Sequence, residues 1–168
     1  MLNPEQWYVD NEITLCKGTP VVKIDRRRRE AIAEDGTRAG YDRLLLATGS
    51  NPFVIPVPGH DLPGVVTFRD IHDVDRMLEA AQRFTHAVVI GGGLLGLEAA
   101  NGLLKQGMKV TVVHLMDSLM ERQLDHAAAR MLKKALEARG INFMLEAKTQ
   151  EIIGKKRVQG VRLADGRE

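Results

Sequence analysis

Hydrophobic residues in the second half of the chain follow two patterns, the helical spacing of amphipathic helices and the short continuous runs of buried strands. Within residues 70–84 the apolar positions follow helical spacing, and two later segments repeat this pattern. The predicted helices are Asp70–Phe84, Leu94–Gln106 and Gln123–Arg139. Short continuous apolar runs separate them, as in strands that are buried on both faces. The predicted buried strands are Val88–Ile90, Val110–Leu115 and Ile141–Leu145.

The order of these elements predicts an α/β fold with a Rossmann-type parallel sheet and flanking helices. Each pair of strands is joined through a helix, and such crossovers are right-handed and place the two strands parallel. Gly107 and Gly140 follow two of the helices, and glycine is a common residue just after a helix C-terminus. The tail, residues 150–168, predicts two further strands around Gly154–Lys156.

The first fifty residues have a β-rich pattern. Thr19–Asp25 and Glu30–Glu34 are predicted strands, followed by an Asp35-Gly36 turn signal, because glycine accepts the positive φ of hairpin turns. Tyr41–Thr48 (YDRLLLAT) is an apolar run that ends at Gly49. This run predicts a strand buried on both faces.

A proline-rich segment separates the two patterns. Residues 51–64 contain Pro52, Pro56, Pro58 and Pro63. Proline lacks a backbone N–H and fixes φ, which excludes a helix or a central strand and predicts a stiff connector. The expected organisation is therefore residues 1–50, the connector 51–64, and residues 65–168.

A glycine-rich loop joins the first predicted buried strand to the next helix, in the stretch AVVIGGGLLGLEAA at residues 87–100. In a G-x-G-x-x-G loop, Gly91 would allow the tight turn, Gly93 the close approach of a pyrophosphate, and Gly96 close helix–strand packing. The helix N-terminus would favour the ligand's negative charge. The alternative is a glycine-rich turn that binds no nucleotide. The predicted pyrophosphate-binding residues are Gly91, Gly92, Gly93, Leu94, Leu95 and Gly96.

Two polar residues near this loop are candidates for contact with a dinucleotide. Glu98 is expected in the first helical turn, where it either complements the helix dipole or contacts the cofactor. His114 ends the second strand, at the position where an acidic residue usually binds the adenosine ribose of NAD. Neutral imidazole would accept one hydrogen bond there, and imidazolium would pair with a 2′-phosphate. The alternative is a histidine that caps the strand and faces solvent.

Composition excludes several other classes of function. The net charge is +2, so no strong field indicates nucleic acid or a membrane surface as a partner. The single cysteine, Cys16, excludes an intrachain disulfide and a multi-cysteine metal site, and we expect no metal. The N-terminus lacks a signal-peptide pattern and no apolar run is long enough to span a bilayer. We therefore expect a cytoplasmic protein.

Two motifs together resemble the FAD-dependent pyridine nucleotide-disulfide oxidoreductase superfamily. They are TRAGYDRLLLATG at residues 37–49 and the glycine loop with Glu98 two places after its last glycine. Within that superfamily, WYVDNEITLCKG, YDRLLLATGSNPFVIPVPG and VVHLMDSLMERQLD are most similar to the large subunit of assimilatory NAD(P)H nitrite reductases. The resemblance covers essentially the whole chain.

The resemblance implies that residues 1–50 are part of an FAD-binding domain and that residues 65–168 are a C-terminally truncated NAD(P)H-binding Rossmann domain. It implies that Ala47, Thr48 and Gly49 line the flavin. Hydride would pass from NAD(P)H to FAD, and electrons would go on to reduce nitrite to ammonia. The iron–sulfur cluster and sirohaem would belong to domains that this chain lacks. No residue is assigned as acid, base or nucleophile.

The same motifs fit a ferredoxin or rubredoxin reductase, an NADH oxidase, or a nucleotide-binding fragment without catalysis. The superfamily's first glycine fingerprint, expected upstream of Trp7, does not occur in the chain. We therefore expect the isolated chain to be flavin-free and inactive as an enzyme. Exposed sheet edges favour self-association, so a homodimer is also expected.

Overall fold

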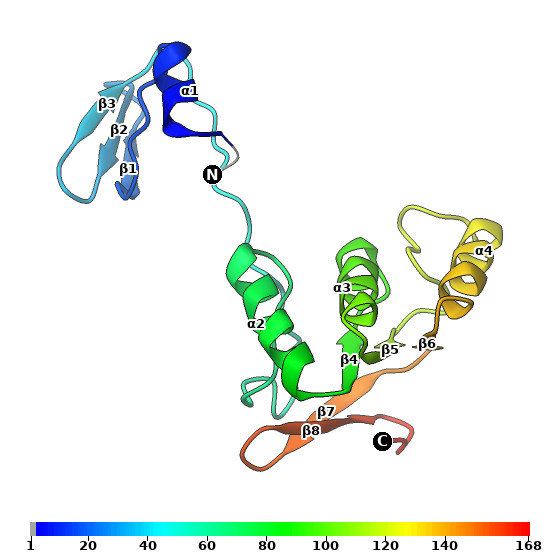
Figure 1. Cartoon of the computed structure of the whole chain (residues 1–168). Coiled ribbons are helices and arrows are strands. Elements are labelled where there is room, and N and C mark those ends of the chain that lie inside the picture. The colour runs from blue at the N-terminus through cyan, green and yellow to red at the C-terminus, as the bar shows by residue number, and fades with distance from the viewer. Residues whose placement is uncertain (1–2) are drawn as a thin grey trace. The chain divides into compact units, whose positions relative to one another are not determined.

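The computed structural model describes residues 3–168, and the chain divides into two compact units, Met1–Gly49 and Ser50–Glu168 (Figure 1). Within residues 3–49, the first unit contains one short helix and one antiparallel sheet with the strand order β1-β2-β3. Its elements are α1 (Glu5–Asp10), β1 (Val21–Asp25), β2 (Glu30–Ala33) and β3 (Arg38–Gly40).

The predicted hairpin elements of the first unit are confirmed. Strands β1 and β2 match the two expected strands to within a few residues. Gly36 has a φ of 87° in the turn after β2, and the Thr37 N–H donates to Asp35 Oδ1 at 2.8 Å. The sequence pattern did not predict α1 or β3, which span only six and three residues.

The predicted strand over Tyr41–Thr48 is wrong. Residues 41–48 have no regular structure, and Leu45 is 87% exposed. A strand is held by hydrogen bonds to its neighbours, and the sheet in residues 3–49 ends at β3, which pairs only with β2. The apolar run therefore has the composition of a buried strand, but the described part of this unit offers it no partner strand to pair with.

The second unit contains the expected parallel sheet, with the order β4-β5-β6. Its strands are β4 (His86–Ile90), β5 (Lys109–Val113) and β6 (Ile141–Met144). Val89 lies opposite Val112 in the first ladder, and Val112 lies opposite Phe143 in the second. The βαβαβ prediction and the α/β fold class are confirmed.

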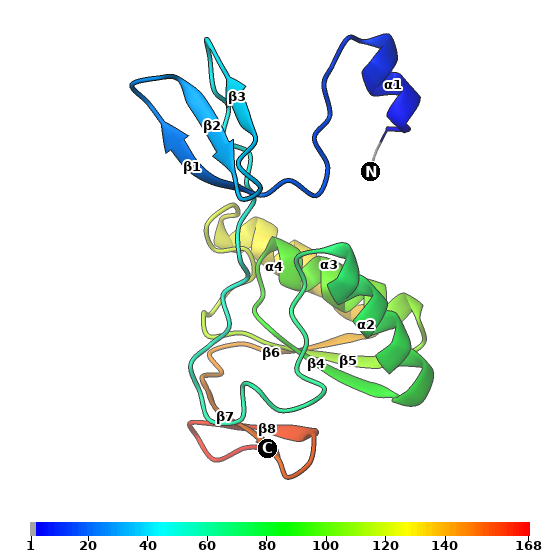
Figure 2. The same ribbon diagram turned by 90° about the vertical axis from the view of Figure 1, so that its left-hand side faces the viewer.

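Three helices cover one face of this sheet (Figure 2). They are α2 (Ile71–Arg83), α3 (Leu94–Lys105) and α4 (His126–Glu137), which match the predicted helices apart from shorter ends. Between them and the sheet lies the main hydrophobic core. Its buried members are Leu97, Ala100, Leu103, Met108, Val110, Val112, Leu119, Leu136 and Ile141. Among residues 3–168, no helix combines the length and apolarity needed to cross a membrane.

Strand β4 is less buried than its apolar sequence predicts. It lies at an edge of the sheet, and Val88 is 47% exposed although Ala87 and Val89 pack against the core. The helices cover only one face of β4. The continuous apolar run therefore does not mark burial on both faces within this unit.

An antiparallel hairpin lies on the other side of the sheet from the helices (Figure 2). It consists of β7 (Thr149–Gly154) and β8 (Val158–Leu163), and Leu163 joins Val113 of β5 in a second buried cluster. The proline-rich segment is hydrogen-bonded to this hairpin. The N–H groups of Ile152 and Val158 donate to the carbonyls of Pro58 and Pro63, both at 2.9 Å.

Helix α2 begins with a reciprocal cap. Asp70 Oδ1 accepts the Asp73 N–H at 2.9 Å, and the Asp73 side chain accepts from the Asp70 backbone. Asp73 is only 3% exposed and also accepts from the Thr67 hydroxyl and the Arg69 N–H, both at 2.8 Å, and from Arg76. This carboxylate therefore ties residues 67–69, which precede the helix, to the first turn of α2.

The Asp73 network predicts a loss of stability when its charge is removed. Burial raises the pKa of the Asp73 carboxyl, but the donors from Thr67, Arg76 and Arg69 together hold it below the ordinary value of 3.8. We expect Asp73→Asn to lower the free energy of unfolding by about 1–3 kcal/mol in urea titrations at neutral pH. Asp75→Asn, an exposed carboxylate on the same helix, is the matched control and should have little effect.

The same network predicts a pH dependence. Because folding lowers the pKa of Asp73, its stabilisation is fully present above 3.8 and is lost as the pH falls further, through the lowered pKa. The stability difference between the wild type and Asp73→Asn should therefore shrink at acid pH. A difference that stays constant down to the acid transition would contradict this role.

Candidate functional site

The glycine loop lies between the end of β4 and the start of α3. Gly91 has a φ of 122°, a conformation that side-chain-bearing residues rarely adopt. Its N–H donates to the Val113 carbonyl at 2.8 Å, which extends the β4–β5 ladder by one step. The chain then turns away from the sheet into α3, as expected for the first glycine of this spacing.

The two later glycines of the spacing have opposite surroundings. A Cβ at Gly96 would lie 2.1 Å from the Gly91 carbonyl oxygen, so only glycine allows α3 to pack this closely on the loop. A Cβ at Gly93 would have no heavy atom within 4 Å. The backbone of Gly93 therefore faces open space, and a ligand could approach the backbone there.

The N-terminus of α3 leaves backbone donors without a partner in the helix. Gly93 is the N-cap and supplies no side-chain cap, and the first turn contains no acidic residue. The Leu97 N–H donates to the Gly93 carbonyl at 3.0 Å, so the N–H groups of Leu94, Leu95 and Gly96 precede the first intrahelical bond. These donors and the helix dipole together favour an anion at this end of α3.

His114 does not face solvent, contrary to one of the alternatives for this residue. It follows β5 directly and is only 8% exposed. The Gly92 N–H donates to His114 Nδ1 at 3.0 Å, so the ring proton resides on Nε2. That Nε2 lies 3.2 Å from Oε2 of Glu121 and donates to it. Both ring nitrogens are thus engaged within the protein.

The segment after His114 holds Gly92 from a second direction. The Met120 N–H donates to the Gly92 carbonyl at 3.0 Å, with Met120 at a φ of 52°. A Cβ at Gly92 would lie 2.7 Å from Leu119 Cδ2 and 2.8 Å from the His114 ring. Gly92 is therefore packed against the protein, and its polar backbone groups are both used.

Glu121 is the functional candidate that the sequence analysis missed. Its side chain is 31% exposed and accepts a hydrogen bond from His114 Nε2. The pKa of its carboxyl lies below the ordinary value, first because its own backbone N–H donates to it; burial raises this pKa, and the hydrogen bond from His114 lowers it again. An acid seven residues after the histidine was the available signal, but only the fold of residues 114–121 brings the two together.

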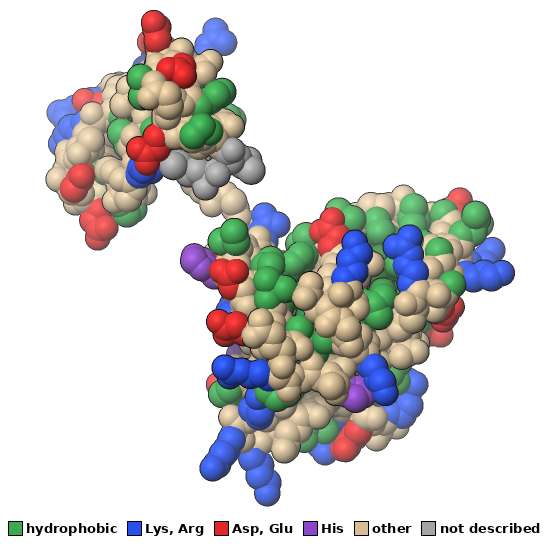
Figure 3. Space-filling model, in the orientation of Figure 1, with side chains coloured by type: hydrophobic (Ala, Val, Ile, Leu, Met, Phe, Trp, Pro, Cys, Tyr) green, Lys and Arg blue, Asp and Glu red, His purple; other side chains and the backbone are tan. Residues whose placement is uncertain are grey.

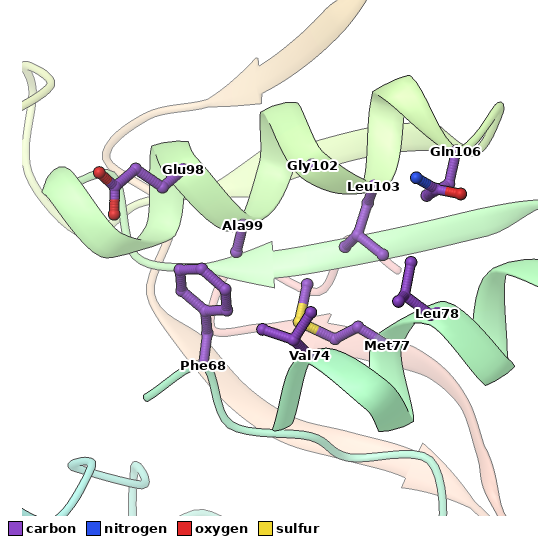
Figure 4. Close-up of a pocket in the computed structure, with 9 residues that line it drawn as sticks. All are labelled: Phe68, Val74, Met77, Leu78, Glu98, Ala99, Gly102, Leu103 and Gln106. Carbon is purple, nitrogen blue, oxygen red and sulfur yellow. The ribbon is translucent and has the colours of Figure 1, made fainter. Parts of the chain in front are cut away.

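Glu98 lies just beyond the first turn of α3, in which it was expected. The helix begins at Leu94, so Glu98 starts the second turn, where the dipole effect is already weak. Its exposed side chain stands at one end of an apolar groove of about 200 Å³ between α2 and α3 (Figure 4). The groove is lined by Phe68, Val74, Met77, Leu78, Glu98, Ala99, Gly102, Leu103 and Gln106. Hydrophobic side chains also gather on the surface over the helices of this unit (Figure 3).

The other predicted site residues lie in the first unit. Ala47, Thr48 and Gly49 are exposed and belong to the segment without regular structure, with Gly49 at a φ of 73°. The structure thus brings together Gly91–Gly96 and His114, with Glu98 on the adjoining turn. In the described part of the chain, no three His, Cys, Asp or Glu side chains are grouped so that they could hold a metal ion.

Comparisons with known proteins agree on one family. A family model described as pyridine nucleotide-disulphide oxidoreductase matches residues 6–168. The nitrite reductase [NAD(P)H] of Bacillus subtilis is 51% identical over 165 residues, which is 98% of this chain and 20% of that protein. The assimilatory nitrate reductase electron transfer subunit of the same organism is 43% identical, over 98% of this chain and 21% of its own length.

A solved structure extends the likeness to the fold. A ferredoxin reductase from Rhodopseudomonas palustris matches with a TM-score of 0.91 and 32% identity, over 99% of this chain and 41% of that one. The chain therefore spans about a fifth of the two curated relatives.

The contact at Gly96 yields a direct test of the loop geometry. We expect Gly96→Ala to lower the free energy of unfolding by about 1–3 kcal/mol, because the new methyl group collides with the Gly91 carbonyl. Gly102→Ala makes the same chemical change in the same helix, where a Cβ meets nothing within 4 Å. That control should raise stability by about 0.5–1 kcal/mol. Equal effects of the two substitutions in thermal unfolding would refute the packing role of Gly96.

Proposed function

The chain belongs to the pyridine nucleotide-disulphide oxidoreductase family, and on this premise we propose that its second unit is the NAD(P)H-binding, electron-input region of a flavin-dependent oxidoreductase. The observation that carries this proposal is the loop itself. Gly93 offers open backbone, and the adjoining α3 N-terminus offers donors that no side chain caps. The pyrophosphate of a dinucleotide fits both properties, since it is anionic and needs close approach to the backbone.

The residues of this chain position the nucleotide and leave the redox chemistry to the cofactors. When bound, the nicotinamide supplies a hydride to flavin, and the protein contributes position and electrostatics. The amides of residues 93–96 would hold the pyrophosphate. The bonds from Gly92 to His114 and Met120 keep the loop in the shape that presents those amides. No side chain here needs to act as an acid, base or nucleophile.

The flavin part of the proposal rests on the family and on the motif at residues 37–49. Ala47, Thr48 and Gly49 would line the flavin, but they offer no helix N-terminus of their own and lie exposed. In residues 3–49 the only helix spans six residues and is preceded by Pro4, without a glycine-rich loop. The proposal therefore assigns the anchoring of FAD to parts beyond this chain and expects the chain by itself to be flavin-free.

Nitrite is the proposed final acceptor, with ammonia as the product. The support is the 51% identity to a nitrite reductase and the match to an assimilatory electron transfer subunit. The iron–sulfur cluster and sirohaem would be held outside this chain. We also propose a cytoplasmic setting, in keeping with the exposed free thiol of Cys16, because reducing compartments preserve free thiols.

A second candidate, favoured by the structural match, is a ferredoxin or rubredoxin reductase, or an NADH oxidase, of the same family. The glycine loop serves each of these equally. The sequence of the complete protein would separate them, because a nitrite reductase requires ligands for an iron–sulfur cluster and sirohaem. A nucleotide-binding fragment without catalysis is the third candidate.

We further propose that the chain forms a homodimer through the edge of its parallel sheet. Strand β4 is an edge strand with exposed Val88 and Ile90, and such an edge presents unpaired backbone groups to another chain. Light scattering should give twice the monomer mass. Val88→Lys should restore the monomer, whereas Val22→Lys on β1 should not; a monomeric wild type would contradict the proposal.

Nucleotide binding gives the main test of the proposed function. We expect NADH or NADPH to bind the chain in calorimetric titrations. Gly93→Ala should weaken this binding by roughly tenfold, equal to about 1.4 kcal/mol, because its methyl group stands where the pyrophosphate approaches. The protein should stay folded with a modestly lower thermal midpoint, because the methyl contacts nothing in the protein but alanine is a poorer N-cap than glycine.

Gly160→Ala provides the control for this test. Gly160 lies in β8, and a Cβ there would also meet nothing within 4 Å. This variant should bind the nucleotide like the wild type. If neither NADH nor NADPH binds at millimolar concentration, the cofactor assignment for this chain fails.

A further inference from the structure

A chain of hydrogen bonds runs from the glycine loop to a partly exposed carboxylate. The Gly92 N–H donates to His114 Nδ1 at 3.0 Å, and His114 Nε2 donates to Glu121 Oε2 at 3.2 Å. The ring is buried and the carboxylate retains 31% of its side-chain exposure. The loop backbone is thereby connected through an imidazole to a negative charge at the protein surface.

His114 occupies a position that usually takes part in nucleotide recognition. In domains with a G-x-G-x-x-G loop, the acidic residue at the end of the second strand accepts hydrogen bonds from the adenosine ribose. Here that position holds a histidine whose two nitrogens are already bonded within the protein. His114 therefore has no acceptor left for a ribose hydroxyl.

Glu121 places a carboxylate beside the end of β5, although it lies seven residues after His114 in the sequence. The preceding residue, Met120, donates its N–H to the Gly92 carbonyl, and Leu119 is buried against Gly92. These contacts fix the backbone of Glu121 beside the loop, and the bond from His114 fixes its side chain. A carboxylate accepts several hydrogen bonds, so contact with His114 leaves capacity for a ligand.

We propose that Glu121, oriented by His114, is the specificity-determining residue that accepts hydrogen bonds from the adenosine ribose and selects NADH over NADPH. This inference rests on the proposed function of the second unit. His114 acts through Glu121 and through Gly92, as a positioning residue.

Charge determines the direction of the selectivity. The lowered pKa of Glu121 keeps its carboxyl ionised at neutral pH. The 2′-phosphate of NADPH carries about two negative charges at neutral pH and would be repelled by this carboxylate. NADH presents a neutral hydroxyl at the same position and donates a hydrogen bond instead. Arg122 is the neighbouring cation, exposed and next in the chain, and it would have the opposite preference.

Titration of the full 168-residue chain with NADH and with NADPH tests the assignment. The wild type should bind NADH more tightly than NADPH by about tenfold or more, the effect of one hydrogen bond to a charged acceptor. Glu121→Gln should weaken NADH binding and leave NADPH binding equal or stronger, so that the preference collapses. Glu121→Asp, which keeps the charge, should retain part of the preference. Arg122→Gln is the matched control and should retain the preference for NADH.

The outcomes separate this inference from the proposed function. If the wild type binds both nucleotides equally, or Glu121→Gln keeps the wild-type ratio, the role of Glu121 is overturned and nucleotide binding by the unit stands. If Arg122→Gln alone changes the ratio, the selectivity resides in that cation, which also overturns the inference. If the wild type binds neither nucleotide, the proposed function itself fails, and the inference fails with it. Thermal unfolding of each variant confirms that it is folded.

Discussion

Two hydrogen bonds to the backbone of Gly92 hold the loop on which the candidate site depends. The N–H of Gly92 is bonded to the His114 ring and its carbonyl to the Met120 N–H, so this residue is held from the segment that follows β5. The next residue, Gly93, is left facing open space as the N-cap of α3. One residue of the loop thus satisfies its polar groups within the protein, and the following residues offer theirs to a ligand.

The rest of the second unit supports this arrangement. The central strand β5 provides the Val113 carbonyl that receives Gly91, and His114 follows it directly. Helix α3 can lie close to the turn because Gly96 has no side chain. The core between the sheet and the helices fixes both elements, so the geometry of the loop is a property of the parallel βαβ unit and not of the loop residues alone.

The sequence pattern predicted those features that depend on local chemistry. The spacing of Gly91 and Gly96 anticipated the tight turn and the close packing of the helix, and the helical periodicity anticipated α2, α3 and α4. It could not predict the direction of His114, because that depends on how residues 115–121 fold back over Gly92. The prediction of a buried strand at residues 41–48 was wrong for a related reason. An apolar composition favours a buried strand, but the strand forms only where a partner strand is present to accept and donate its hydrogen bonds.

The most direct test of nucleotide binding by the α3 N-terminus is the response of individual backbone amides to NADH, measured by nuclear magnetic resonance on isotope-labelled protein. The largest shifts are expected at the amides of Gly93, Leu94, Leu95 and Gly96, which have no partner in the helix. A smaller shift is expected at Gly92, whose amide is bonded to His114. Shifts absent from residues 93–96, or concentrated on a distant element such as β8, would contradict nucleotide binding at this helix end.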